Sequence, residues 1–162
     1  MVTARAKVGY VQEALQRVQA VAEVVQRTAL KQLSSVVSRC LHAVFQDEAY
    51  QFRIDFTRKR ERTEAELIFF RDDLELRDPA KEGGIGQVDV AALALRLACL
   101  KMAQPAPRLF VAADEPLKNI NGEEYQNRVG ELLMTLSREM GVQMLFISDD
   151  DWLKVGKVIE LD

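Results

Sequence analysis

The chain of 162 residues has little histidine, cysteine, proline or glycine. Its only histidine, His42, excludes a metal site built from several histidines and leaves few routes to imidazole-based catalysis. Its two cysteines, Cys40 and Cys99, form no CxxC pair, so we expect neither a disulfide framework nor a zinc knuckle. Both cysteines lie in apolar, helical contexts and are interpreted as reduced core residues.

Long hydrophobic runs are also absent. No apolar stretch reaches the roughly 18 residues of a membrane span, and residues 1–25 lack the apolar block of a secretory signal. We therefore expect a cytoplasmic protein with no membrane partner. A composition of 48% hydrophobic and 29% charged residues, with only eight glycines and four prolines, predicts a folded globular unit.

Net positive charge is confined to the first part of the chain. Residues 1–60 contain ten Lys/Arg and five Asp/Glu, whereas residues 61–162 contain twelve and twenty. A basic arm can face a DNA backbone, although a solvated helix surface has the same composition. The basic cluster Arg58, Lys59, Arg60 and Arg62 has the same two interpretations, of which a solvated turn is favoured.

Residues 3–46 contain no proline and one glycine, which predicts one long helix or two stacked helices. Steps of three and four residues define a coiled-coil seam, made of Val8, Val11, Leu15, Val18, Ala22, Val25 and Ala29. From Leu30 the apolar stripe widens, as in a helix that packs on a globular core. We expect a coiled-coil base over 1–46 that continues a longer coiled coil or needs a partner helix.

Residues 47–162 are expected to form an α/β lobe. Alternating side chains from Tyr50 to Thr57 and a second run over 65–71 predict a β-hairpin, with its turn at 58–62 and a surface connection over 72–82. The apolar stretch 88–102 predicts a helix buried between layers. An amphipathic helix is expected over 123–140, and strands over 109–113, 142–147 and 158–161, the first two covered on both faces.

The strongest local motif is an apolar strand that runs directly into Asp114 and Glu115. Such a strand places both carboxylates at the carboxyl end of a parallel sheet, where α/β proteins bind ligands. This is the Walker B pattern, in which Asp114 would hold Mg²⁺ and Glu115 would polarise the water that attacks the γ-phosphate of ATP. A strand followed by two acids also occurs without any such role.

A second motif, Gly84-Ile85-Gly86-Gln87, precedes the buried helix. Glycines at this place let a phosphate approach free backbone N–H groups at the positive end of a helix dipole. An ordinary loop leading into a helix has the same sequence character.

The order of these motifs resembles the C-terminal lobe of an SMC/SbcC-like ABC-type ATPase head. The segments GGIGQVDVAALALRLA, DEPLK and QMLFISDD are similar to the patterns GGGxVDVxxxALRLA, DEPxK and QxxxxTHD of bacteriophage-encoded SMC-like ATPases. The likeness runs from about residue 8 to the end of the chain. It implies that Gly84 to Gln87 form the signature loop, which contacts ATP bound by an opposite head, and that residues 118–121 form the D-loop. It places Ser148 and Asp149 on the switch loop.

Three residues depart from the family pattern. Gly84 replaces the usual signature serine, Asn121 replaces the D-loop aspartate, and Asp149 replaces the switch histidine. An aspartate facing a γ-phosphate would repel it instead of stabilising the transition-state charge. The chain also has no G-x-x-x-x-G-K-[ST] loop, the part that cradles phosphates.

The resemblance therefore implies an ATPase only in combination with an N-terminal lobe that carries Walker A, from the same parent chain or a separate one. It implies ATP and Mg²⁺ as cofactors, a head-to-head homodimer, DNA as a partner in recombination, repair or replication, and a possible nuclease subunit. The alternative is a catalytically degenerate ABC-like dimerisation or clamp module without turnover.

Overall fold

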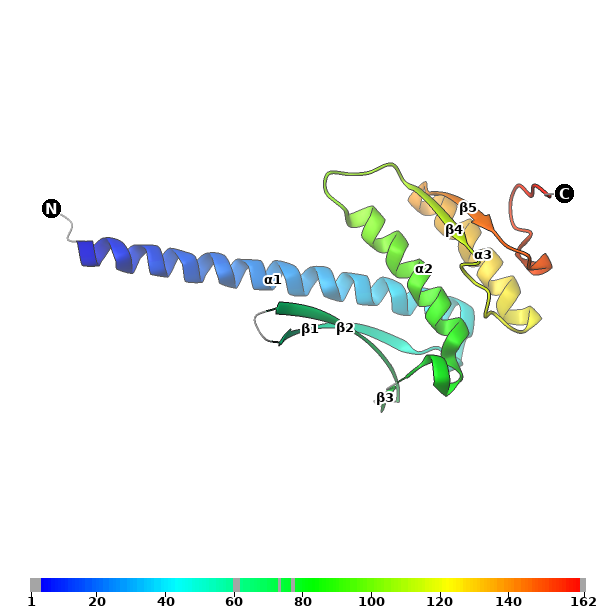
Figure 1. Ribbon diagram of the computed structural model, residues 1–162, viewed down its shortest axis with the longest axis horizontal. Helices are drawn as coiled ribbons and strands as arrows, with labels where there is room; N and C mark the ends of the chain where they lie inside the picture. Colours follow the sequence, from blue (N-terminus) through cyan, green and yellow to red (C-terminus); the bar gives the residue numbers. More distant parts are fainter. Residues whose placement is uncertain (1–3, 60–61, 73, 77, 161–162) are drawn as a thin grey trace.

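The structure is a computed structural model that describes residues 4–59, 62–72, 74–76 and 78–160. A long helical arm, α1 (Ala4–Phe45), ends in an α/β lobe that contains two small sheets (Figure 1). Helices α2 (Ile85–Met102) and α3 (Glu123–Met140) lie beside the end of the arm. The expected long helix and α/β class are thus present. No helix among the described residues is both long and apolar enough to cross a membrane.

Helix α1 is a single helix whose two halves have different surroundings. The predicted seam residues are exposed in this chain: Val8, Leu15 and Val18 keep 56%, 56% and 66% of their accessible surface. Beyond the change of register, Leu41 and Val44 are completely buried. The prediction that the apolar stripe widens where α1 meets the core is confirmed, and the seam packs against no other element among the described residues.

The predicted hairpin forms a three-stranded antiparallel sheet. Strand β1 (Gln51–Lys59) pairs with β2 (Arg62–Arg71), and β3 (Leu74–Leu76) extends the sheet within the stretch expected to be a plain connection. The paired strands continue into the expected turn, because Arg58 pairs with Thr63 and Lys59 with Arg62. Arg60 lies outside the described residues, as do the side chains of the rest of the basic cluster.

Two serines of α1 satisfy the other edge of β1. The hydroxyl oxygen of Ser34 accepts the Ile54 N–H at 3.1 Å, and that of Ser38 accepts the Phe52 N–H at 3.0 Å. Backbone groups at a strand edge need such partners when they are buried. The serines therefore fix the hairpin along the arm in one register.

Helix α2 is buried along one side only. Leu93 and Leu97 are buried, whereas Arg96 and Cys99 are exposed. The interpretation of Cys99 as a core residue is therefore wrong, because the helix turns it away from the core. Cys40 is buried as expected, and burial raises the pKa of its thiol.

The second sheet consists of two parallel strands, β4 (Phe110–Asp114) and β5 (Gln143–Ile147), joined through α3. Helix α3 ends as predicted at Gly141, whose φ of 66° is the left-handed conformation of a helix C-cap. The strands alternate between half-buried and exposed residues, and Leu145 keeps 52% of its surface. The expectation that both faces are covered is wrong for the described chain, because α3 and the core cover one face only.

The expected third strand is also absent. Residues 158–160 have no strand conformation, and Leu161 lies outside the described residues. Within the described residues, β4 is the strand that pairs with β5, so the segment 158–160 has no strand partner. Apolar residues alone could not form a strand there, since a strand requires a hydrogen-bonding neighbour.

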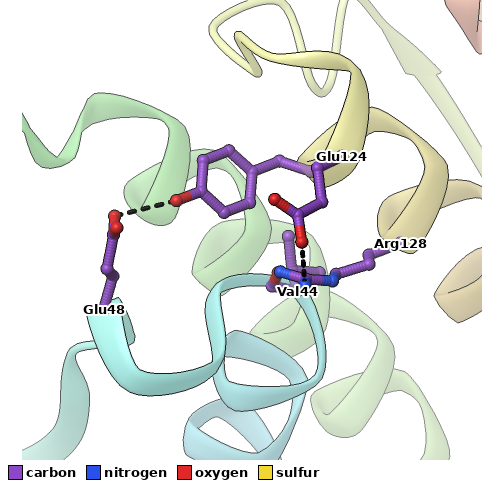
Figure 2. Close-up of polar contacts among 5 residues, drawn as sticks. Val44, Glu48, Glu124 and Arg128 are labelled. Atoms are coloured by element: carbon purple, nitrogen blue, oxygen red, sulfur yellow. Dashed lines mark hydrogen bonds and ion pairs between the residues drawn. The ribbon is translucent and has the colours of Figure 1, made fainter.

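The end of α1 is fixed to α3 by a contact between two rings and by the polar contacts drawn in Figure 2. The rings of Phe45 and Tyr125 lie 5.1 Å apart, and the Tyr125 hydroxyl donates to a Glu48 carboxylate oxygen at 2.8 Å. That hydrogen bond raises the pKa of Tyr125. Arg128 donates to the Val44 carbonyl at 3.1 Å and also pairs with Glu124. A cation at the end of a helix satisfies its last carbonyls and complements its dipole.

Replacing a core leucine at this junction tests the packing. Leu41→Ala removes a completely buried side chain, and we expect unfolding to require about 2–5 kcal/mol less free energy. Leu15→Ala on the exposed half of the same helix is the matched control, with an expected change within about 0.5 kcal/mol. Urea denaturation of both variants measures the difference, and equal effects would contradict this description of the core.

Candidate functional site

Glu115 occupies an unusual backbone position directly after β4. Its φ of 47° lies in the left-handed region, which costs a non-glycine residue on the order of 1 kcal/mol. The Glu115 N–H donates to the Ile147 carbonyl oxygen at 2.9 Å, so the ladder between β4 and β5 continues through this residue. The neighbouring strand therefore holds the strained residue in place.

The Glu115 carboxylate faces the loop that follows β5. One oxygen accepts the Asp149 N–H at 3.0 Å, and the other lies 3.4 Å from the Ser148 hydroxyl. No basic side chain among the described residues pairs with Glu115. The structure thus brings together Glu115, Ser148 and Asp149, and it leaves the carboxylate without a neutralising ion pair.

Asp149 and Asp150 add two further carboxylates beside Glu115 at this edge of the sheet. Oxygen atoms of Glu115, Asp149 and Asp150 lie within 4.8 Å of one another, and one buried Asp150 oxygen has no hydrogen-bond partner among the described residues. Carboxylate oxygens are ligands that suit Mg²⁺. Asp114 ends β4 with an exposed side chain and is not part of this group.

The acidic side chains of this loop do not cap the helix that follows it. Asp150 is the N-cap of the short 3₁₀ helix Asp151–Leu153, and its side chain makes no capping hydrogen bond. The group at Glu115 therefore contains an acidic side chain that the local fold leaves unused.

The glycine segment is more ordered than a loop. Residues Ala80–Gly84 form a π-helical turn that leads into α2, and the Gly84 N–H donates to the Pro79 carbonyl at 2.8 Å. The expectation of free backbone N–H groups is therefore wrong for Gly84, because the extra turn uses its donor. A Cβ on Gly84 would lie 2.2 Å from the Tyr50 ring, so the packing requires glycine there.

Gln87, the last residue of the predicted signature loop, serves the fold. Its side chain is buried, accepts the Tyr50 N–H at 2.7 Å and donates to the Glu48 carbonyl at 2.9 Å. Both polar ends of the buried amide thus have partners inside the chain. Ile85 is the exposed member of the predicted loop, at 43%.

The segment after the acidic pair packs against the start of α2. Leu117 and Ile120 are buried, while Lys118 and Asn121 are exposed. A Cβ on Gly86 would approach the Asn119 carbonyl oxygen to 2.8 Å, so backbone meets backbone at this point. The two motifs predicted from the sequence therefore belong to adjoining surfaces.

Asp89 joins these two surfaces and was not among the predicted site residues. Its carboxylate accepts hydrogen bonds from the Asn119 N–H and from the Asn119 side-chain amide, both at 3.0 Å. The sequence feature that could have indicated this residue is that Asp89 is an acid in a mostly apolar helix. The sequence could not indicate which backbone group would face it.

No protein-family model and no curated protein matches the chain, but solved structures do. The Smc head with a coiled coil and joint from Pyrococcus yayanosii matches at a TM-score of 0.66 and 20% identity, over 92% of this chain and 28% of that chain. The Smc head with an extended coiled coil from Pyrococcus furiosus, bound to the C-terminal domain of ScpA, matches at 0.66 and 20%, over 92% and 36%.

A third structure, an SmcHead bound to the C-winged helix domain of ScpA, matches at a TM-score of 0.58 and 22% identity, over 82% of this chain and 38% of that chain. The chain thus spans well under half of each matched chain. At these identities the likeness establishes the fold: an α/β lobe with a long N-terminal helix, as found in part of an SMC head.

The close approach at Gly84 gives a test of the site's packing. Gly84→Ala inserts a methyl group against Tyr50 and the Pro79 carbonyl, and we expect a loss of about 1–3 kcal/mol in the free energy of unfolding. Gly9→Ala is the matched control, because nothing lies within 4 Å of its Cβ position. The control should be neutral or stabilise by about 0.5–1 kcal/mol. Thermal denaturation that shows no loss in Gly84→Ala would contradict the described packing.

Proposed function

We propose that this chain is the C-terminal half of the ATP-binding head of an SMC/SbcC-like protein, bacteriophage-encoded, that acts in DNA recombination, repair or replication. The observation that carries the proposal is the contact of the Glu115 carboxylate with Ser148 and Asp149, on a fold like part of an SMC head. Residues 33 and 34 positions apart meet where a composite nucleotide site would need an acid and a switch.

In this proposal the two acids, Asp114 and Glu115, have different roles. Asp114, exposed at the end of β4, would hold Mg²⁺, and Glu115 would polarise the attacking water. Bound Mg²⁺ would neutralise charge that develops on the phosphate oxygens. Glu115 suits the role of base because the neighbouring loop orients both of its oxygens and no Lys or Arg side chain among the described residues pairs with them.

The remaining nucleotide contacts lie on the adjoining surface. Ile85 and Gly86 at the start of α2, together with Asn121, face the nucleotide of an opposite head in a head-to-head homodimer. Gly84 and Gln87 support this surface from behind, since the Gly84 N–H and the Gln87 amide are used within the chain. The carboxylate of Asp149 slows turnover, because a negative charge beside the γ-phosphate opposes the transition state.

The phosphate cradle comes from an N-terminal lobe that carries the Walker A loop. Three features of the described residues fit such a partner: β5 pairs on one side with β4, the sheet exposes Phe110, Leu145 and Ile147, and a groove of about 790 Å³ separates β5 from the segment 153–160. Parallel strands are ordinarily covered on both faces. A strand and a covering layer from the missing lobe would fill these places.

The long arm and the charge distribution indicate the other partners. The exposed seam of α1 takes a second helix, and its fixed junction with α3 would carry movement of the head to the coiled coil and bound DNA. A nuclease subunit would act on that DNA, in the cytoplasm of a bacterial host. Basic residues of the first 60 positions supply the phosphate contacts.

One observation favours a second function, a clamp without turnover. The switch position carries Asp149, whose carboxylate lies beside those of Glu115 and Asp150. A head of this kind would bind ATP and dimerise but would not hydrolyse it.

Glu115→Gln separates these functions. The chain is combined with its Walker A lobe, and we expect DNA-stimulated ATP hydrolysis to fall on the order of 100-fold, since the general base is lost while ATP binding persists. Glu131→Gln on the exposed face of α3 is the control and should keep full activity. Unchanged turnover in Glu115→Gln would remove Glu115 from the mechanism, and tight ATP binding with no hydrolysis by the unaltered head would favour the clamp.

Leu145→Asp tests the surface for the missing lobe. A carboxylate buried in an apolar interface without a partner is costly, so we expect association with the Walker A lobe to weaken at least tenfold, or about 1.4 kcal/mol. Leu67→Asp is a closely matched control, because Leu145 and Leu67 are both 52% exposed and both lie in strands, but in different sheets. Titration calorimetry that gives equal affinities for the two variants would refute this interface.

A further inference from the structure

Asp89 is an acid placed one turn into an apolar helix, and it is half-buried. Its side chain crosses from α2 to the segment that follows the acidic pair. One oxygen, Oδ2, accepts both the backbone N–H and the side-chain amide of Asn119, each at 3.0 Å. Hydrogen bonds to a charged acceptor are stronger than those between neutral groups.

The segment 117–121 has its other contacts arranged around this pair. The Ile120 N–H donates to the Leu117 carbonyl at 3.2 Å, and the Asn121 side-chain amide donates to the Asn119 carbonyl at 3.2 Å. Asn119 thus takes part in most of the hydrogen bonds of the segment. It is joined to α2 by Asp89 and by the close backbone approach at Gly86.

We propose that Asp89 is a positioning residue that locks the segment 117–121 to the start of α2, so that the two parts that face an opposite head move as one body. This role rests on the proposed function for its effect on ATP hydrolysis. Asp89 acts through Asn119, because its Oδ2 accepts both hydrogen bonds from that residue. Small errors of placement at a composite site are expensive, since a misplacement of about 1 Å can cost on the order of 100-fold in rate.

The chemistry of the contact predicts which substitution is tolerated. Asparagine keeps the length of the side chain, and its one carbonyl oxygen can accept both hydrogen bonds from Asn119. Alanine removes the acceptor altogether. A residue whose role was only to supply negative charge would not be replaced by asparagine.

The test compares Asp89→Ala, Asp89→Asn and the control Asp47→Ala, a variant of an exposed aspartate with no hydrogen bond among the described residues. Each is prepared with the Walker A lobe, and three quantities are measured: amide hydrogen exchange across 117–121, kcat, and the affinity for ATP. Amides in the middle of α3 report whether the fold is intact.

In Asp89→Ala we expect exchange at Asn119 to rise at least tenfold and kcat to fall at least tenfold, with the affinity for ATP within twofold. Exchange in α3 should be unchanged, and Asp89→Asn should largely restore both the exchange at Asn119 and kcat. Unaltered exchange at Asn119 would overturn the lock. Faster exchange with unaltered kcat, or exchange that rises equally in α3, would overturn the positioning role.

The two proposals fail separately. An unaltered head that hydrolyses no ATP overturns the proposed enzymatic function and the effect on kcat with it, while exchange at Asn119 still decides whether Asp89 holds the segment.

Discussion

The register of β4 against β5 is the constraint on which the candidate site depends. Asp114 pairs with Ile147, and the Glu115 N–H extends the ladder by one hydrogen bond to the Ile147 carbonyl. Because the strands run parallel, both carboxyl ends reach the same edge, and Glu115 lies beside Ser148 and Asp149. A shift by one residue would turn Glu115 to the other face and separate it from the switch loop.

The same small sheet has one covered face and one exposed face. Its two strands bury one face against α3 and the core, and they leave apolar side chains exposed on the other. The junction of α1 with α3, by contrast, is fully packed and hydrogen-bonded. The arm is thus fixed firmly to a lobe whose small sheet has one exposed, partly apolar face.

Local pattern predicted most of the elements, because helix and strand periods are properties of neighbouring residues. The long helix, the hairpin and α3 follow from periodicity, whereas α2, β4 and β5 follow from short apolar runs. The errors have a common cause: exposure and strand pairing depend on residues far along the chain or outside it. Cys99, Leu145 and the segment 158–160 were assigned to the core or to a sheet without knowledge of what would cover them.

The candidate site divides in the same way. The acidic pair could be found from the sequence, since a strand ending in two acids specifies its own location. The π-helical turn that uses the Gly84 N–H, the internal role of Gln87 and the contact of Asp89 with Asn119 could not be found, because each depends on a partner at least five residues away and mostly on another element. The resemblance supplied roles for residues, and the structure supplied their neighbours.

The most direct measurement is a crystal structure of this chain combined with its Walker A lobe, a non-hydrolysable ATP analogue and Mg²⁺. The account predicts the γ-phosphate in front of Glu115 of one head, and the start of α2 from a second head on its far side. A nucleotide bound away from the carboxyl end of β4, or a head that closes without any contribution from α2, would contradict it.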